Sequence, residues 1–474
     1  MFYLNILKKL YSPEHIVPES ERLGELPSAR SAYRDVFKLA WPAILEAIML
    51  HLCGMVDTMM VGVVGTKAIS AIGTSGPVRT LIIAFYSALS IANSAVIARR
   101  IGEGNKQEAS ETMRQSLVYS LIISLLVCVP GYIFTPHLMK LCGTPDSIMG
   151  DAVAYVRIWL IGVPIWGLSV PILSALRAAG RPHLAVISTI IANLVNVFFN
   201  YLLIGGNWGF PRMGVRGAAA ATMSCYIVQA GIAIYLVLRK NSPVNLNLKT
   251  KFRFDPNIFL SLKIVFPAQL FSGFVSYIAS TIQTRIINSI GNDDSFAAYQ
   301  IIMTLYGIFV SVAGGFAGAS GTLVGQSLGK RRPDISVLYT RLCIVFAIVF
   351  SIFFVIFFSV FDEFVIGLYV PDRIAGKATF DAALIMLYML IVSTPINVMH
   401  QVYWGTLQGA GDSKFLTFQN FFSLITRTTL FYVLCLPLGF GVIGTLLAII
   451  LDDTCRVTMS HIRFKKGEWI GIRL

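Results

Sequence analysis

Twelve long apolar stretches divide this chain, and they limit its possible folds more than any other feature. Each stretch is long enough for an α-helix to cross the hydrocarbon core of a bilayer, which takes about 20 residues. The sequence is 55% hydrophobic and 13% charged, about half the charged share of a soluble protein. We therefore expect an all-α integral membrane protein. The predicted spans are residues 36–62, 74–98, 114–136, 151–176, 184–206, 214–238, 258–288, 295–325, 337–360, 380–407, 414–437 and 440–460.

The distribution of positive charge predicts how the chain is oriented. Most of the 38 Lys and Arg residues fall in the terminal tails and in loops that follow the even-numbered spans. An excess of these residues is typical of the cytoplasmic side. We therefore expect a multi-pass protein of the cytoplasmic (inner) membrane with both termini in the cytoplasm. The net charge of +14 then belongs to cytoplasmic loops and indicates no nucleic-acid partner. The first thirty residues lack a clean apolar core, so no cleavable signal peptide is expected.

The two halves of the chain resemble each other. Lys38–Pro42 matches Lys263–Pro267, and three further motif pairs follow in order at an offset of 225–231 residues. An even number of spans in each half means that both copies enter the membrane in the same direction, as a parallel repeat around a central cavity. The predicted parts are an N-terminal tail (1–35), an N-lobe (36–238), a cytoplasmic linker (239–257), a C-lobe (258–460) and a C-terminal tail (461–474).

Two carboxylates lie inside the first span. Asp57 is flanked by apolar residues on both sides, and Glu46 precedes it by eleven residues. Eleven steps of a helix with 3.6 residues per turn return a side chain to nearly the same face. Because a charge at membrane depth is costly, such residues are candidates for a functional site. A structural alternative for Asp57 is a helix-end carboxylate that reaches the outer interface. For Glu46 the alternative is an ion pair with a base such as Lys38.

Polar residues of the fifth and sixth spans are predicted to lie at the depth of Asp57. Asn193, Asn196 and Asn200 share one helical face, and amides in lipid need partners. The predicted span directions place Asp57, Asn200 and Thr222 in one layer, about 8–12 Å below the outer surface at about 1.5 Å per residue. A carboxylate, amide oxygens and a hydroxyl suit a hard cation. Helix–helix hydrogen bonding is the structural alternative for the two asparagines Asn196 and Asn200.

Six short motifs follow one another along about residues 36–466. They are Trp41-Pro42-Ala43-Ile44-Leu45-Glu46, Met55-Val56-Asp57-Thr58, Leu176-Arg177-Ala178-Ala179-Gly180, Asn196-x-x-x-Asn200, the run Gly214–Thr222, and Leu407-Gln408-Gly409-Ala410-Gly411-Asp412. Together they resemble the multidrug and toxic compound extrusion (MATE) family. The resemblance implies an antiporter that exports bulky, often cationic compounds in exchange for Na⁺ or H⁺. It also implies that the Asp of the first helix binds the coupling ion with polar residues of helices 5 and 6.

The coupling-ion site carried over from this resemblance consists of Asp57, Asn196, Asn200 and Thr222, with Na⁺ expected at the first three. Some prokaryotic members of the family have Asp where Asn200 stands, so the N-lobe of this chain has one fewer titratable group and Asp57 is the main proton acceptor in that lobe. The repeat offset places Gln283 opposite Asp57, so the carboxylate is not duplicated in the second half.

Four residues are further candidates for substrate or ion coupling: Glu46, Gln283, His400 and Arg427. His400 has a structural alternative as a hydrogen-bonded core histidine. Arg427 lies in the middle of the eleventh span and must face a cavity or an acid, which the sequence does not identify. Asp453 and Arg456 are three residues apart in the twelfth span and are expected to pair with each other.

We expect a secondary transporter that is not an enzyme, needs no cofactor apart from its coupling ion, and works as a monomer in the lipid bilayer by alternating access. Its expected substrates are organic cations or drugs. A lipid or lipid-linked oligosaccharide flippase is the main alternative, but basic residues at mid-membrane depth are scarce. A polyprenyl transferase would need Asp-rich magnesium motifs, and an ATP-driven pump would need a phosphate-binding loop; neither motif occurs. The seven cysteines show no paired spacing and are expected to be core residues.

Overall fold

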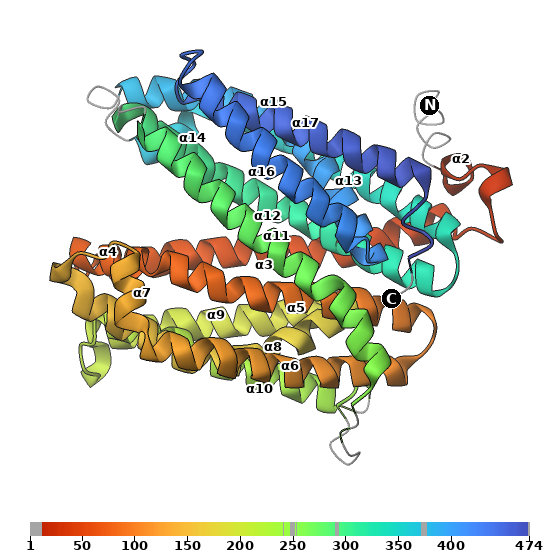
Figure 1. The fold of residues 1–474 in the computed structure, drawn as a ribbon, viewed down its shortest axis with the longest axis horizontal. Helices are drawn as coiled ribbons and strands as arrows, with labels where there is room; N and C mark the ends of the chain where they lie inside the picture. The colour runs from red at the N-terminus through yellow and green to blue at the C-terminus, as the bar shows by residue number, and fades with distance from the viewer. Residues whose placement is uncertain are drawn as a thin grey trace. The chain divides into compact units, whose positions relative to one another are not determined.

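Twelve long helices make up most of the protein. The computed structural model describes residues 12–239, 241–246, 252, 254–289, 293–370 and 377–472, and no β-strand occurs within these ranges. The long helices are α3 (Ala29–Gly62), α5 (Gly76–Gly102), α6 (Lys106–Ile133), α8 (Asp146–Ala178), α9 (Pro182–Gly205), α10 (Val215–Leu238), α11 (Pro256–Ser289), α12 (Asp293–Gly329), α13 (Pro333–Val360), α15 (Lys377–Ala410), α16 (Ser413–Cys435) and α17 (Ile443–Lys466) (Figure 1).

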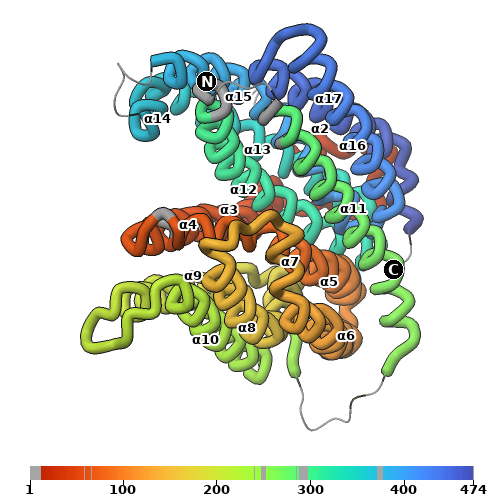
Figure 2. The backbone as a smooth tube through the Cα atoms, turned by 60° about the vertical axis from the view of Figure 1, so that its left-hand side comes forward, coloured from red at the N-terminus to blue at the C-terminus, as the bar shows by residue number. Residues whose placement is uncertain are grey.

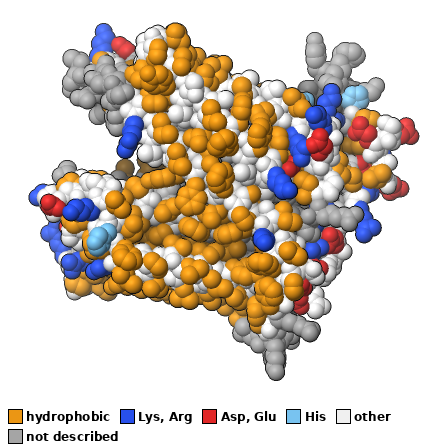
Figure 3. All heavy atoms as spheres, in the orientation of Figure 1, with side chains coloured by type: hydrophobic (Ala, Val, Ile, Leu, Met, Phe, Trp, Pro, Cys, Tyr) orange, Lys and Arg blue, Asp and Glu red, His pale blue; other side chains and the backbone are white. Residues whose placement is uncertain are grey.

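The predicted all-α membrane fold is confirmed. Ten helices in the described part of the chain are long and apolar enough to cross a membrane. The two remaining long helices, α16 and α17, fall outside that group because polar and charged residues make them less apolar, among them Arg427, Asp452 and Asp453. On the face seen in Figure 3, hydrophobic side chains cover the middles of the helices, and charged side chains gather mostly near the helix ends. Such a surface is stable in lipid and would be unstable in water.

The chain packs as two compact units, which we describe separately. The N unit is Leu45–Leu270, and the C unit combines the residues up to Ile44 with Phe271–Arg473. Each unit therefore takes part of α3 and part of α11. In the N unit, for example, Ile258, Leu262 and Val265 of α11 pack against α5. These units follow packing rather than the sequence repeat, so the predicted lobe boundaries at 36–238 and 258–460 stay a prediction.

Helix bounds reveal the internal repeat. Helices α3 and α11 each have 34 residues, and α6 and α13 each have 28. The partners begin 227 residues apart, at 29 and 256 and at 106 and 333. Helices α8, α9 and α10 correspond in the same way to α15, α16 and α17. The long helices of the two halves thus correspond one to one in the same order.

One helix break distinguishes the halves. The N unit has a short helix α4 (Thr66–Thr74) followed by α5, whereas α12 runs without a break over the corresponding 37 residues. Pro77 lies in the first turn of α5, and Thr304 occupies the equivalent position in α12. Because proline lacks an amide hydrogen and clashes with the preceding turn, it begins a new helix there. Four short helices were not predicted from the sequence. They are α4, α2 (Pro13–Ile16), α7 (Thr135–Leu141) and α14 (Asp362–Tyr369).

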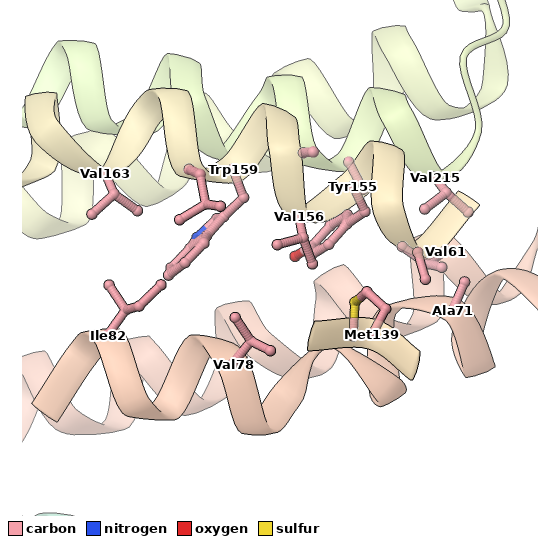
Figure 4. Close-up of a cluster of buried hydrophobic side chains, with 14 of the residues drawn as sticks. Val61, Ala71, Val78, Ile82, Met139, Tyr155, Val156, Trp159, Val163 and Val215 are labelled. Carbon is pink, nitrogen blue, oxygen red and sulfur yellow. The ribbon is translucent and has the colours of Figure 1, made fainter. Parts of the chain in front are cut away.

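The core of the N unit lies between α8 and the helices around it. Trp159 of α8 is 1% exposed, and its ring points toward Ile82 of α5 (Figure 4). Tyr155 lies one turn away on the same face and is also buried. Helix α10 packs against both α8 and α9, so the three run side by side (Figure 2). This packing fixes the walls of the site described below.

Small residues bring α12 and α15 of the C unit into close contact. A Cβ atom built on Gly409 would lie 2.6 Å from the Cα of Gly321, and one built on Gly405 would lie 2.6 Å from the Cα of Ala317. Membrane helices use such small residues to let their backbones approach. The N unit uses hydrogen bonds at the equivalent place, where Ser94 donates to the Ser174 carbonyl at 3.2 Å.

The segment before α3 is anchored to the C unit. The side chain of Val17 is fully buried, and the amide of Leu23 donates to Asp334 at 3.2 Å. Arg332 pairs with Asp334 at 2.8 Å and also donates to the Glu25 carbonyl at 3.0 Å. The hydrogen bond that the Arg332 guanidinium donates to Asp334 raises the pKa of Arg332 above its usual value. The sequence also predicts a short amphipathic helix at Tyr3–Tyr11, and these residues lie outside the described ranges.

Candidate functional site

Helices α3 and α9 run side by side in one register through the N unit. Thr189 donates to Glu46 at 2.9 Å, and Asn200 donates to Asp57 at 2.6 Å. The two pairs have the same sequence separation of 143 residues. Both carboxylates therefore face α9, with about 16 Å of helix between them at 1.5 Å per residue. The predicted shared stripe of Glu46 and Asp57 is confirmed.

Asp57 lies in a cluster of buried amides. Asn196 is 4% exposed and Asn200 is 2% exposed, one turn apart on α9. Asp57 is five residues from the end of α3, and Asn200 is five residues from the end of α9. The predicted layer of polar residues near one end of the helices therefore exists. A charge-assisted hydrogen bond of 2.6 Å is among the stronger contacts available to a carboxylate.

The amide of Asn196 fits best with its nitrogen toward Asp57. In this orientation the nitrogen donates to the Asp57 Oδ1 at 2.8 Å and to Oδ2 at 3.3 Å, while the Asn196 oxygen accepts from the Thr222 backbone amide at 3.2 Å. The amide is assigned from its hydrogen-bond partners, as is usual for asparagine. Asn196 thus links α3 to α10. The Thr222 hydroxyl itself donates to the Ala218 carbonyl of its own helix at 3.0 Å.

A cavity of about 590 Å³ opens beside this cluster. Asp57, Asn196, Asn200 and Thr222, all predicted from the sequence, lie in its wall. The remaining lining is mainly apolar and aromatic, with one further charged residue. These other residues are Leu50, Gly54, Val61, Ile69, Ile72, Gly73, Arg79, Tyr155, Asn193, Ala218, Cys225 and Tyr226. A mostly apolar cavity with a few convergent polar groups is the usual form of a small-molecule site.

The oxygen atoms around Asp57 fit a proton or a monovalent cation. The Asn200 Oδ1 atom is buried and has no hydrogen-bond partner, so it can accept a bond from an incoming ligand at no cost to an existing one. Asp57 is the one carboxylate among the described residues that line the cavity, and no group of three or more His, Cys, Asp or Glu side chains suited to a metal occurs in the described residues. Rotation of the Asn196 amide would add its oxygen to the same site.

Glu46 occupies the other end of the α3–α9 interface. It pairs with Arg177 at 3.4 Å and accepts from Thr189 at 2.9 Å. Gln229 of α10 extends the network by donating to the Thr189 hydroxyl at 3.3 Å. The basic partner of Glu46 is therefore Arg177 and not Lys38, the example suggested by the sequence. Glu46 is therefore both an ion-pair residue and part of a polar network with Thr189 and Gln229.

The C unit contains a second polar cluster inside its helices. Asn397 of α15 donates to Asp453 at 2.8 Å and to the Tyr306 hydroxyl at 3.0 Å. Asp452 accepts from Ser423 at 2.7 Å and from Thr426 at 3.1 Å. The predicted Asp453–Arg456 pair exists, with nitrogen and oxygen 4.0 Å apart. Two acids from α17 are thus held by polar groups of α15 and α16.

The other predicted candidates of the second half belong to this unit. His400 is 3% exposed, and neither ring nitrogen has a hydrogen-bond partner. Gln419 of α16 lies beside the ring as its nearest hydrogen-bonding side chain, so a role as a core histidine stays open for His400. Arg427 lies over the Phe431 ring at 5.9 Å, and the charges of Asp452 and Asp453 act on it. Asp452 and Asp453 are thus the acids near Arg427, although no ion pair joins it to either one and its Nε atom has no hydrogen-bond partner. Gln283 is buried on α11.

Comparison with known families identifies the chain. The family model MatE matches it twice, over residues 42–202 and 269–433. The two matches begin 227 residues apart, the same offset as the helix pairs. Together they cover more than half of the sequence.

The chain belongs to the MatE family.

Relatives of this MatE protein include transporters and probable multidrug resistance proteins. An uncharacterized transporter of Bacillus subtilis, YisQ, is 25% identical over 92% of this chain and 95% of its own length. A probable multidrug resistance protein NorM of Thermotoga maritima is 24% identical over 98% and 96%. An FAD transporter of Shewanella oneidensis is 23% identical over 64% and 66%. A membrane transport protein is therefore the common description.

Solved structures share the fold of this MatE protein. A MOP superfamily transporter from Pyrococcus furiosus has a TM-score of 0.85 at 20% identity, covering 93% of this chain and 97% of the other. A structure described as MATE in the bent conformation has a TM-score of 0.83 at 20% identity, covering 92% and 96%. The two-lobed fold is common to all of them.

Three residues near the MatE site were missed by sequence reasoning. Arg79 follows the Gly76-Pro77 break and lines the cavity with Asp57. Arg177 pairs with Glu46, although it was quoted only as part of a motif. Thr189 precedes Asn200 by the same eleven residues that separate Glu46 from Asp57, and this matched spacing is a signal that was available in the sequence.

Proposed function

We propose that this MatE protein is a secondary transporter that exports bulky organic compounds, mainly cations, in antiport with Na⁺ or H⁺. The cycle is alternating access, in which binding at Asp57 favours one state and substrate favours the other. Without such differential affinity, ion and substrate movement would not be coupled. Location in the inner membrane with both termini in the cytoplasm belongs to the same proposal, as does function as a monomer.

The observation that carries the proposal is the half-buried Asp57 carboxylate, held by two buried asparagines beside a cavity of about 590 Å³. Asn196 and Asn200 hold this carboxylate, and the cavity has room for a ligand of drug size. A group that binds an ion and also faces the substrate space is suited to make the two compete. Relatives named as probable multidrug resistance proteins support the export of organic compounds.

No observation favours a flippase over this proposal. A site for a lipid-linked pyrophosphate would need several cations in one cavity. In the N-unit cavity the described lining contains one arginine and one aspartate. One positive and one negative side chain suit a small molecule that carries a single charge or none, and they do not suit a pyrophosphate with several negative charges.

Transport in proteoliposomes tests the proposal. The full-length protein is reconstituted, and movement of ethidium is followed under an imposed pH gradient and then under an imposed Na⁺ gradient. We expect one gradient to drive ethidium transport in the parent and Asp57→Asn to abolish it. Asp151→Asn is the matched control, because Asp151 is exposed near the start of α8. If Asp57→Asn and Asp151→Asn both transport like the parent, Asp57 is not the coupling residue.

A further inference from the structure

Arg79 is the second charged residue in the wall of the N-unit cavity. Of the residues that line the cavity, only Asp57 and Arg79 carry a charge at neutral pH. The cavity therefore has no net charge when Asp57 is ionised. A site built only to attract organic or inorganic cations would gain from an unopposed carboxylate. The presence of an arginine in the same small space needs an explanation.

Aromatic rings hold the guanidinium of Arg79. Its central carbon lies 5.8 Å from the centre of the Tyr155 ring and 5.7 Å from that of Trp159. Both rings extend from α8 toward the helix that carries Val78 and Ile82, which is α5 (Figure 4). Cation–π contacts of this kind fix a charge in place without neutralising it. The Arg79 Nε atom is buried and has no hydrogen-bond partner.

The charge of Arg79 reaches Asp57. Arg79 of α5 and Asp57 of α3 line the same cavity, together with Tyr155 of α8, whose ring lies under the Arg79 guanidinium; among the charged side chains, Arg79 is the one whose charge acts on Asp57. The other titratable groups near Asp57 are thiols and phenols, namely Cys53, Tyr155 and Cys225. These groups are neutral at about pH 7 in their usual state. Arg79 is thus the countercharge that the N unit provides for Asp57.

We propose that Arg79 is a tethered cation that determines ion selectivity by excluding Na⁺ from the Asp57–Asn200 site. The inference rests on the proposed function, because it concerns the ion that acts at Asp57. A sodium ion bound at Asp57 would add a second positive charge to a mostly apolar cavity that already holds Arg79, and buried uncompensated charge is unfavourable. Without Arg79, the same ion would complete a neutral pair with Asp57.

Substitutions at Arg79 separate charge from shape. Arg79→Gln removes the charge, and Arg79→Met removes it while keeping an apolar stem against the two rings. Arg79→Lys keeps the charge. Arg157 is a matched control, because it also lies over an aromatic ring, that of Tyr132 at 5.2 Å, but it is not part of the cavity lining.

The test measures binding of ²²Na⁺ to the purified full-length protein at constant ionic strength, with choline replacing sodium. We expect Arg79→Gln and Arg79→Met to bind Na⁺ at least about tenfold more tightly than the parent, since a nearby unit charge acts strongly in a low-dielectric site. Arg79→Lys and Arg157→Gln should bind like the parent. Adding Asp57→Asn to Arg79→Gln should remove the gain. Two charge-removing variants keep the test usable if one of them folds poorly.

Two results would overturn the inference. One is tight Na⁺ binding by the parent that depends on Asp57 and is unchanged in both Arg79→Gln and Arg79→Met. The other is a gain in Arg79→Lys equal to that in Arg79→Gln, because charge would then not be the cause. The binding assay needs no transport. A gain in Na⁺ affinity without ethidium transport in the parent would therefore support the role of Arg79 and contradict the proposed function.

Discussion

Replacing Gly409 by alanine should separate α12 from α15 and destabilise the C unit. The added Cβ would lie 2.6 Å from the Cα of Gly321, whereas carbon atoms in contact prefer about 3.5–4.0 Å. The two helices must therefore move apart by about 1 Å. Neither side can relieve the clash by rotating a side chain, because the atoms on α12 belong to the backbone.

The energetic cost comes from looser packing along the whole α12–α15 interface. A gap of about 0.5–1 Å forfeits roughly a quarter to a half of the dispersion energy between each pair of touching atoms. Overpacked substitutions typically cost about 1–3 kcal/mol, and we expect the upper part of that range here. For a unit of this size the apparent melting temperature should fall by about 5–10 °C. The assay is thermal unfolding of the purified protein in detergent, followed by intrinsic tryptophan fluorescence.

Gly314→Ala is the matched control for Gly409→Ala. A Cβ on Gly314, in the same helix as Gly321, would meet no atom within 4 Å. Its melting temperature should equal that of the parent or rise slightly, because alanine favours helix more than glycine does. The reasoning is refuted if Gly409→Ala and Gly314→Ala melt within about 2 °C of each other.

Three further substitutions test other contacts. Asp334→Asn weakens the anchor of the segment before α3, so trypsin should cleave after Arg22 about threefold faster or more; unchanged cleavage would show that the segment is held otherwise. Glu46→Gln and Arg177→Gln should show a coupling of about 1 kcal/mol in a double-mutant cycle of thermal stability, because the pair is only partly exposed; strict additivity would contradict the ion pair. Asn397→Leu should cost about 2–3 kcal/mol, because the buried Asp453 loses its amide donor; a stability equal to that of the parent would mean that the contact is unimportant.

The long helices and the Asp57 layer were predictable because each follows from a local rule. Apolar runs of spanning length predict membrane helices, and the twelve predicted ranges each overlap one long helix. The eleven-residue spacing of Glu46 and Asp57 predicts a shared helical face. The register with α9 then follows from the polar residues at matching intervals on that helix, which lipid would leave without partners.

The remaining features depend on contacts between distant parts of the chain. Nothing near Arg79 in the sequence indicates that its guanidinium would lie over Tyr155 and Trp159, more than seventy residues away. Asp452 and Asp453 are adjacent in sequence but have different partners, because successive residues on a helix point about 100° apart. The partner of Arg427 likewise depends on how α16 and α17 pack. The contact partners of these side chains depend on how distant helices pack, and the periodicity of the sequence does not predict that packing.

The most direct test of Asp57 as the coupling site measures ion flux and substrate flux in the same proteoliposomes. A pH-sensitive or Na⁺-sensitive dye is trapped inside, and ethidium is added outside with no ion gradient imposed. The account predicts that ethidium entry drives a counterflow of one ion in the parent and in Asp151→Asn, and that Asp57→Asn shows no counterflow. Ion counterflow that persists undiminished in Asp57→Asn would contradict it.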